Sequence, residues 1–198
     1  EGVDALFFPS ASDIYPHGLN EQTFVEVPGI SDLWCGASRP GHFRGVATIV
    51  CKLFNMVQPD VACFGEKDFQ QLQVIRTMVE DLSMPIDIVG VPTRRQPDGL
   101  AMSSRNGYLT ETQRQQATQI FATMNTMRDA LQARSDSQQA ILDLATAQLE
   151  GAGLKPDYVA ICNARTLQPA TEEDNDLVIL MAAYMGKTRL IDNLHFTR

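Results

Sequence analysis

The 198-residue sequence is poor in positive charge, with 16 lysines and arginines against 24 aspartates and glutamates and a formal net charge of −8. A protein that wraps nucleic acid needs a basic face, so this balance argues against a nucleic-acid partner. Long apolar runs are also missing: no stretch approaches the roughly 20 apolar residues that span a bilayer, so no membrane partner is expected. With 44% hydrophobic residues, the chain still has enough apolar material for a core.

Residues that form disulfides or bind metals are sparse as well. The four cysteines include no Cys-x-x-Cys pair, and this scatter fits a reducing cytoplasm better than a disulfide framework. His17, His42 and His195 are far apart and lack cysteine or carboxylate companions at ligand spacing. We therefore expect a cytoplasmic protein in which no residue serves as a metal ligand.

The first half of the sequence alternates between strand and helix patterns. Strands are predicted at 3–8, 23–27, 61–64 and 86–91, and helices at about 45–57 and 69–82. Short connections from strand to helix to strand are typical of βαβ units in a parallel sheet. Residues 1–92 are therefore predicted to belong to an α/β domain.

After Pro92 the pattern changes to a polar loop, two helices and clustered strands. A capping box at 110–113 predicts a long helix to about Ala133, and a second box at 135–138 predicts a helix that ends near 151–153. Strands are predicted at 158–162, 177–184 and 188–191. Helices followed by strands indicate a small α+β domain over residues 93–198.

Residues 64–71, Phe-Gly-Glu-Lys-Asp-Phe-Gln-Gln, follow a predicted parallel strand at the end where open α/β sheets bind ligands. Gly65 permits a tight turn and the close approach of a ligand. Lys67 is expected in the first turn of the next helix, where a cation is favourable only if an anion such as phosphate also binds. The alternative is a surface ion pair with Glu66 or Asp68.

Two glutamines follow that lysine in the sequence. A glutamine near a strand end can hold a small polar substrate, because its amide offers both donors and an acceptor. Gln70 and Gln71 are therefore candidates for substrate contact. The alternative for both is a solvated helix face.

A second set of donors, Met-Ser-Ser-Arg-Asn, occupies residues 102–106 in the polar loop. Arg105 is suited to bidentate contact with phosphate oxygens. Together with Arg94 and Arg95 it makes this loop locally positive, which would attract an anionic ligand. The alternative is a flexible surface loop.

His42 lies in a third segment, residues 39–45. A histidine there could act as a general base. No acid or nucleophile at a telling spacing supports that role, so a structural or capping role is favoured.

Taken together, these segments resemble the pantoate–β-alanine ligase family. The matching features are Arg-Pro-Gly-His-Phe-Arg-Gly-Val at 39–46, the block at 64–71, Asp-Gly-Leu-Ala-Met-Ser-Ser-Arg-Asn at 98–106 and Thr-Arg-Leu-Ile-Asp-Asn at 188–193. The resemblance runs over essentially the whole chain, and Gly-Glu-Lys-Asp with Ser-Ser-Arg-Asn is specific in combination. It implies a partial Rossmann-like sheet of the nucleotidyltransferase type over residues 1–92, with residues 93–198 closing over the ATP site.

The resemblance also implies an activity. The family uses Mg²⁺ and ATP to condense pantoate with β-alanine through a pantoyl adenylate, releasing pyrophosphate and then AMP, and its members are typically homodimers. The partners implied are therefore these small molecules and a second copy of the chain. Two alternatives stay open: a non-catalytic nucleotide-binding or assembly module, and another adenylyltransferase of the same superfamily.

Individual residues acquire roles from the same resemblance. The implied ATP site consists of Gly65, Glu66, Lys67, Asp68, Arg94, Met102, Ser103, Ser104 and Arg105. Among these, Lys67, Ser103 and Arg105 are the donors expected to stabilise charge on the phosphates during catalysis. Pantoate is expected to contact Gln71, Ile49 and Val50.

One family feature is missing from this sequence. The family's His-x-Gly-His motif, which binds the nucleotide, has no counterpart, because the segment at His42 has one histidine and a different order. The chain also enters an apolar run directly after Glu1 and Gly2. We therefore expect a C-terminal portion whose catalysis is impaired on its own.

Overall fold

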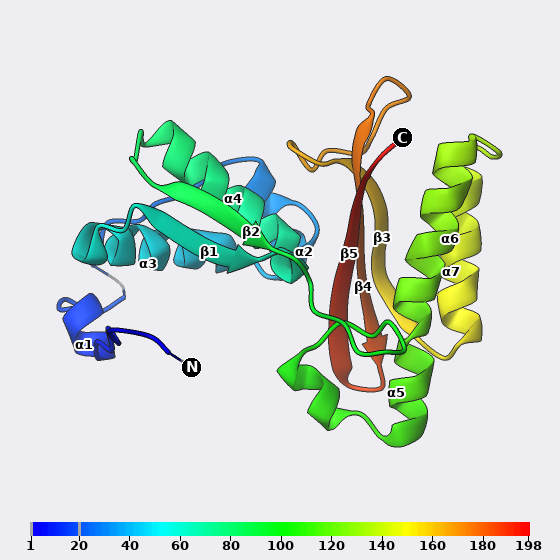
Figure 1. Ribbon diagram of the computed structural model, residues 1–198, viewed down its shortest axis with the longest axis horizontal. Coiled ribbons are helices and arrows are strands. Elements are labelled where there is room, and N and C mark those ends of the chain that lie inside the picture. Colours follow the sequence, from blue (N-terminus) through cyan, green and yellow to red (C-terminus); the bar gives the residue numbers. More distant parts are fainter. Residues whose placement is uncertain (1, 20) are drawn as a thin grey trace.

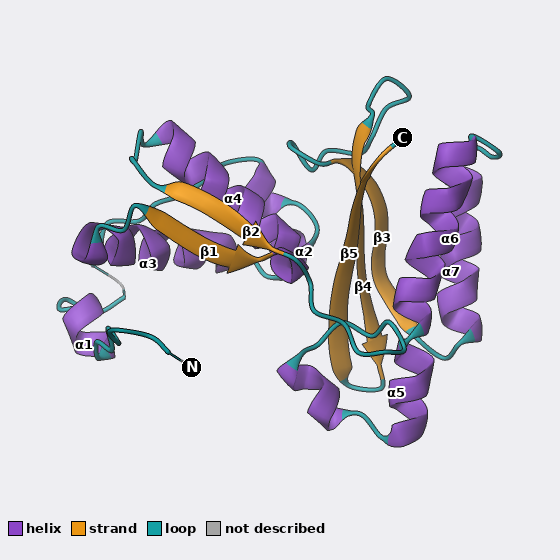
Figure 2. Ribbon diagram, viewed as in Figure 1, coloured by secondary structure: helices purple, strands orange, loops and turns teal. Residues whose placement is uncertain are grey.

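The computed structural model describes residues 2–19 and 21–198. It contains a two-stranded parallel sheet and a three-stranded antiparallel sheet, which lie side by side in Figure 1. Figure 2 shows that helices cover each of them. The predicted α/β fold class, a partial parallel sheet followed by a region of helices and antiparallel strands, is confirmed.

The parallel sheet is built from one strand–helix–strand unit. Strands β1 (Val61–Gly65) and β2 (Asp87–Val91) pair in parallel, and helix α4 (Phe69–Asp81) connects them. Helix α3 (His42–Val57) precedes β1. All four elements match their predicted ranges within three residues, because helical stripes and short apolar runs are the most dependable patterns in a sequence.

Only one face of this sheet is packed. Its inward residues, Ala62, Phe64 and Ile88, contact the core cluster that contains α3 and α4. The outward residues of both strands are exposed, in the alternation expected of β-structure. The large exposed apolar side chains on that outer face are Val61, Val89 and Val91.

Two strands predicted near the N-terminus are wrong. The large apolar side chains of residues 3–8 are between 53% exposed, at Phe7, and 89% exposed, at Phe8. Residues 23–27 are also irregular. An apolar run becomes a strand only where another strand satisfies its backbone hydrogen bonds, and neither segment pairs with a strand among the residues that the structure describes. The backbone of Val25 hydrogen-bonds instead to the Thr48 hydroxyl. Short elements surround the second segment: α1 (Ala11–Ile14), η1 (Ile30–Asp32) and α2 (Cys35–Ser38).

The second region has three helices beside an antiparallel sheet. The helices are α5 (Glu111–Ala117), α6 (Gln119–Ala133) and α7 (Gln138–Gly151), and the strands are β3 (Lys155–Asn163), β4 (Asp176–Met185) and β5 (Thr188–Thr197). The sheet order is β3-β4-β5, with β4 in the centre. The three predicted strands are confirmed, each longer than its apolar run.

The helix predictions for this region need two corrections. The capping box between Thr110 and Gln113 is confirmed, but the expected long helix is divided at Thr118 into α5 and α6. The N-cap of α7 is Ser137, whose side chain accepts a hydrogen bond from the Ala140 N–H, and not Ser135. Both serines precede the helix, and only the backbone path decides which hydroxyl reaches the free N–H groups.

The central strand joins two hydrophobic cores. Val178 and Leu180 face the cluster that contains α3 and α4, whereas Ile179 and Met181 face the cluster that contains α6 and α7. Because successive side chains of a strand point to opposite faces, β4 is apolar almost throughout. One core therefore includes residues from both sides of position 92, and the domain division at 92 stays a prediction.

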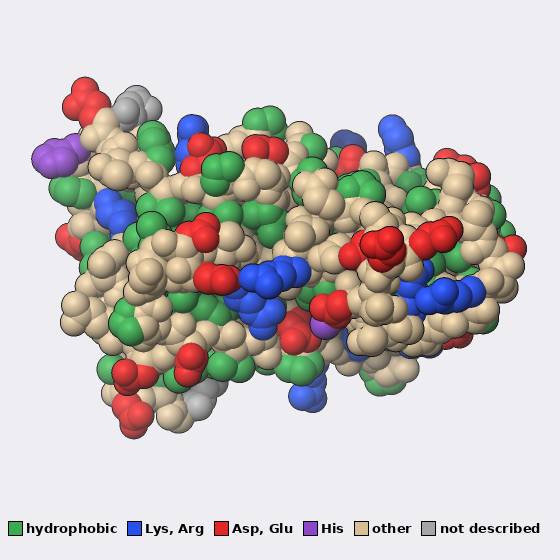
Figure 3. Space-filling view, turned by 90° about the horizontal axis from the view of Figure 1, so that it is seen from above, with side chains coloured by type: hydrophobic (Ala, Val, Ile, Leu, Met, Phe, Trp, Pro, Cys, Tyr) green, Lys and Arg blue, Asp and Glu red, His purple; other side chains and the backbone are tan. Residues whose placement is uncertain are grey.

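No helix among the described residues is long and apolar enough to cross a membrane. On the face seen in Figure 3, lysine and arginine side chains gather in small groups beside acidic ones. This mixture fits a chain with a net charge of −8.

Candidate active site

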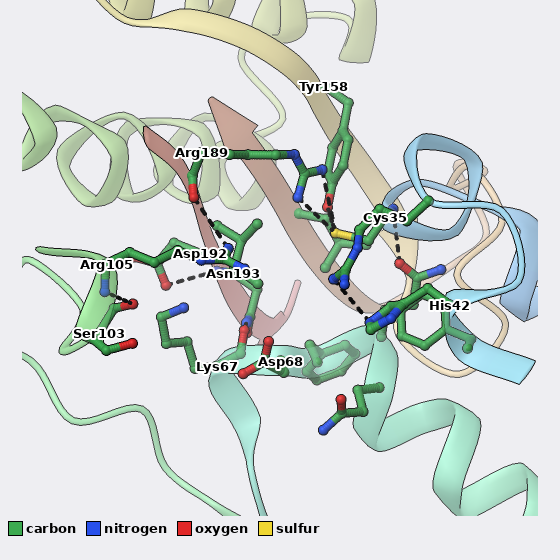
Figure 4. A pocket seen from close by; sticks show the side chains of 18 residues that line it. Cys35, His42, Lys67, Asp68, Ser103, Arg105, Tyr158, Arg189, Asp192 and Asn193 are labelled. Carbon is green, nitrogen blue, oxygen red and sulfur yellow. Dashed lines mark hydrogen bonds between the residues drawn. The ribbon is translucent and has the colours of Figure 1, made fainter. Parts of the chain in front are cut away.

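A cavity of about 230 Å³ lies between the end of β1, strand β5 and the loop that follows β2. Six of the residues that the family resemblance assigned to the site line it: Lys67, Asp68, Gln71, Ser103, Ser104 and Arg105. Gln70, the other glutamine named as a candidate, lines it as well. Figure 4 shows that Lys67 and Asp68 enter from one side and the Ser103–Arg105 segment from another. Segments far apart in the sequence thus place their polar side chains around one space.

Lys67 lies in a single 3-10 turn, η2 (Glu66–Asp68), between β1 and α4, and not in the first turn of the helix. It forms no ion pair with any residue that the structure describes, so the surface pairing with Glu66 or Asp68 is not observed. Its side chain points into the cavity, toward the segment of Arg105 (Figure 4). The lysine is therefore available to a ligand.

The segment with the serines and Arg105 begins the turn η3 (Ser104–Tyr108). The Ser103 hydroxyl accepts a hydrogen bond from the Arg105 N–H at 3.2 Å, which caps this turn. One Arg105 guanidinium nitrogen donates to the carbonyl oxygen of Arg189 at 3.3 Å. This places a hydroxyl and a guanidinium in the lining of the cavity, where both can reach an anionic group.

Arg189, Tyr158 and Cys35 form the opposite wall of the cavity. The Arg189 guanidinium pairs with the Asp157 carboxylate at 2.8 Å, and its nitrogens lie 3.6 Å from the Cys35 sulfur. The Tyr158 hydroxyl lies 3.1 Å from the same sulfur. Burial, together with the nearby Cys35, raises the pKa of Tyr158, so the phenol stays protonated.

His42 is the first residue of α3 and lines the cavity. The N-cap of that helix is Gly41, so His42 has no capping role. A guanidinium nitrogen of Arg39 lies 3.1 Å from the imidazole Nε2. Burial first, and then the charge of Arg39, lower the pKa of His42, so the ring is neutral at pH 7.

The charges around the cavity are unevenly compensated. Asp192 is held by Arg95, and Arg189 is held by Asp157. The remaining charged side chains of the lining are the cations Arg39, Lys67 and Arg105 and the single carboxylate of Asp68. A cavity in which cations predominate attracts an anionic ligand.

Several proposed residues do not line the cavity: Gly65, Glu66, Arg94, Met102, Ile49 and Val50. Gly65 has extended backbone torsions that any residue adopts, and Val50 belongs to the hydrophobic core. The roles of all six stay predictions. Gln70 is structural, because its buried amide donates to the carbonyl oxygens of Ile30 and Leu33 and accepts from the Cys35 N–H.

Sequence reasoning missed Cys35, Tyr158, Arg189, Asp192 and Asn193 as lining residues. The last three lie in the segment 188–193, which matched the family without a role for any member. Cys35 and Tyr158 carry no signal in the sequence, because their contact joins residues 123 positions apart.

An α/β fold with a cavity lined by cations and hydroxyls is typical of enzymes that act on anionic small molecules. Residues 1–195 match the model of the family described as pantoate-beta-alanine ligase. The chain belongs to this family, as its sequence resemblance implied.

Curated relatives and solved structures agree with this assignment. A pantothenate synthetase of Shewanella loihica is 61% identical over 197 residues, which are 100% of this chain and 70% of the relative. The crystal structure of pantothenate synthetase from Thermus thermophilus has a TM-score of 0.91 and 43% identity, covering all of this chain and 71% of its own. A third structure is a pantoate-beta-alanine ligase from Francisella tularensis, complexed with beta-gamma ATP and β-alanine. It has a TM-score of 0.71 and 34% identity, and the match covers 93% of this chain and 61% of that one.

Proposed function

We propose that this chain serves the ATP-dependent condensation of pantoate with β-alanine to pantothenate. In the first step the pantoate carboxylate attacks the α-phosphorus of ATP, which forms pantoyl adenylate and releases pyrophosphate. In the second, the amine of β-alanine attacks the acyl carbon and AMP leaves. Membership in the pantoate–β-alanine ligase family supports the overall reaction.

The observation that carries the proposal is the meeting of Lys67 with the Ser103–Arg105 segment in one cavity. Negative charge on the phosphate oxygens and on the departing pyrophosphate grows in the first step. The Lys67 ammonium, the Ser103 hydroxyl and the Arg105 guanidinium are donors suited to that charge. Gln71 lines the same cavity, and its amide could hold the carboxylate or hydroxyl groups of pantoate.

Mg²⁺ is proposed to enter as part of the substrate, bound to the triphosphate. The described residues contain no group of three or more side chains that could hold a metal ion by themselves. Magnesium usually binds through one or two carboxylates together with substrate phosphates, and Asp68 is the one lining carboxylate not held by an arginine. The residues present therefore fit a metal delivered by the nucleotide.

The remaining proposals concern the setting of this activity. We propose a cytoplasmic homodimer, as the family resemblance implies, with small molecules as its other partners. The adenine is proposed to lie near Arg94, with Gly65, Glu66, Met102 and Ser104 along the rest of the nucleotide, and the apolar part of pantoate near Ile49 and Val50. Of these placements, the cavity lining supports most directly the binding of the ATP phosphates, because Lys67, Ser103 and Arg105 line it.

Pyrophosphate release tests the proposal. The 198-residue chain is incubated with Mg²⁺ and ATP, with and without pantoate, beside the Shewanella loihica relative as a positive control. We expect ATP binding and pantoate-dependent release, slower than in the relative. Release that pantoate does not change would favour another adenylyltransferase, and no release from a folded chain that binds ATP would favour a nucleotide-binding module.

A further inference from the structure

The Asn193 side chain reaches from strand β5 to the turn that carries Lys67. Its amide nitrogen donates to the carbonyl oxygens of Glu66 and Lys67, each at 2.9 Å. A side-chain amide has two N–H donors, so both are directed at this one turn. Asn193 is buried, with 7% of its surface exposed, and the two hydrogen bonds therefore lie in surroundings of low polarity.

The turn is otherwise lightly restrained. It is a single 3-10 turn, which has poorer hydrogen-bond geometry than an α-helix. Gly65 stands before it with open space around its Cα, and the Asp68 side chain makes no capping hydrogen bond to α4. Among the described residues, Asn193 thus provides the side-chain hydrogen bonds that join this turn to the antiparallel sheet, across 126 positions of sequence to Lys67.

The neighbouring residue, Asp192, holds the other polar segment of the cavity. Its carboxylate accepts two hydrogen bonds from Arg95. Arg95 forms an isolated β-bridge with Ala101, shortly before the segment of Ser103. Because adjacent side chains of a strand diverge, Asp192 and Asn193 reach two different segments from one place on β5.

We propose that Asn193 is a positioning residue that sets where the Lys67 ammonium lies relative to the Ser103–Arg105 segment. The inference rests on the proposed binding of ATP phosphates by Lys67. A donor to phosphate must be aimed to within a fraction of an ångström, and a displacement near 1 Å can cost about 100-fold in rate. Because the amide nitrogen of Asn193 is directed at the two carbonyl oxygens of the turn, Asn193 acts on the lysine through the backbone.

The substitution Asn193→Asp tests this with little change of shape. It replaces the amide nitrogen, with its two N–H donors, by a carboxylate oxygen, which faces the carbonyl oxygens of Glu66 and Lys67 and repels them. We expect ATP affinity to fall about 5- to 50-fold. Asn193→Ala removes the donors without adding charge, and is expected to act in the same direction if the aspartate variant folds poorly.

A double-mutant cycle shows whether the effect passes through the lysine. In a Lys67→Gln background, Asn193→Asp should change ATP affinity by less than about 2-fold, since the ammonium to be positioned is gone. The affinity of Asn193→Asp relative to wild type should recover as the pH falls from about 8 to about 5. A protonated carboxyl can again donate one hydrogen bond to the turn, which should restore the position of the lysine.

Asn163→Asp is the matched control, because Asn163 makes a similar side-chain hydrogen bond, to Asp174, away from the cavity. It should leave ATP affinity within about 2-fold of wild type. Amide hydrogen exchange provides a second measurement that needs no ligand. Peptides spanning residues 64–71 should exchange several-fold faster in Asn193→Asp and be unchanged in Asn163→Asp.

The outcomes separate this inference from the proposed function. If wild type binds ATP but Asn193→Asp alters neither affinity nor exchange at 64–71, the positioning role is overturned and the proposed function stands. If wild type binds no ATP, the proposed function fails, and exchange at 64–71 still decides whether Asn193 holds the turn. Equal losses of affinity in the wild-type and Lys67→Gln backgrounds would also overturn the positioning role.

Discussion

Arg95 and Asp192 form a bidentate ion pair in which two guanidinium nitrogens lie 2.6 and 3.0 Å from the two carboxylate oxygens. The pair is largely buried, with 18% and 5% of the two side chains exposed. The Arg95 guanidinium also lies over the Phe121 ring, with 3.7 Å between its central carbon and the ring centroid. These contacts fasten the loop after β2 to strand β5, beside the cavity.

Asp192→Asn should therefore destabilise the protein. It removes one charge of a buried pair and leaves Arg95 uncompensated, which we expect to lower the free energy of unfolding by about 2 to 4 kcal/mol. Urea unfolding followed by the fluorescence of Trp34, the single tryptophan, measures this. Asp129→Asn is the control: Asp129 is 67% exposed in its pair with Arg128, so a loss below about 1 kcal/mol is expected. Equal losses in the two variants would contradict the importance of burial.

Lys67→Gln should weaken ATP binding without unfolding the chain. A charge-assisted hydrogen bond to phosphate is lost, and we expect affinity to fall about 10- to 100-fold. Isothermal titration with Mg²⁺ and ATP measures the change. Lys155→Gln removes the same charge from the exposed start of β3 and should leave affinity within about 2-fold. Similar losses in both variants would mean that net charge, and not the position of Lys67, governs binding.

Two glycine substitutions should have opposite effects on stability. A Cβ at Gly36 would overlap the backbone carbonyl oxygen of Ser31, so Gly36→Ala should cost about 2 to 4 kcal/mol. Gly45 lies within α3 with no atom near its Cβ position, so Gly45→Ala should stabilise the protein by about 0.5 to 1 kcal/mol. Thermal unfolding of both variants tests the pair, and a stabilised Gly36→Ala would show that the packing around α2 is looser than described.

Stability should depend on pH through His42. Burial, followed by the charge of Arg39, lowers the pKa of His42 below its ordinary value of 6.5, with a smaller opposing influence of Asp68. Above pH 6.5, the ordinary pKa of histidine, the ring is neutral in both the folded and unfolded states. As the pH falls below it, the unfolded state takes up the proton first, so the folded state loses stability.

The variant His42→Gln isolates this contribution. Urea unfolding of wild type and variant between about pH 7 and pH 5 should show a shallower loss of stability in the variant, because it has no imidazole to protonate. Parallel curves for the two proteins would show that His42 does not contribute.

The sequence determined the local elements and the chemistry of the site. Helices α3 and α4 and strands β1 and β2 follow from short-range hydrophobic periodicity, which the chain carries within each element. Lys67 was identified because a cation expected in the first turn of a helix calls for a bound anion, and Arg105 because it belongs to a dense set of donors suited to phosphate. The family itself could be inferred from the order of these short segments, as the match over residues 1–195 confirms.

The tertiary structure decided what depends on distant partners. The runs at 3–8 and 23–27 have strand-like composition, but a strand exists only through hydrogen bonds to another strand, and such pairing is not encoded locally. Tyr158, Arg189 and Asn193 have no role that their neighbours in sequence reveal. Asn193 reaches Lys67 only because β5 passes beside the end of β1, and such long-range contacts are set by the packing of β4 between two cores.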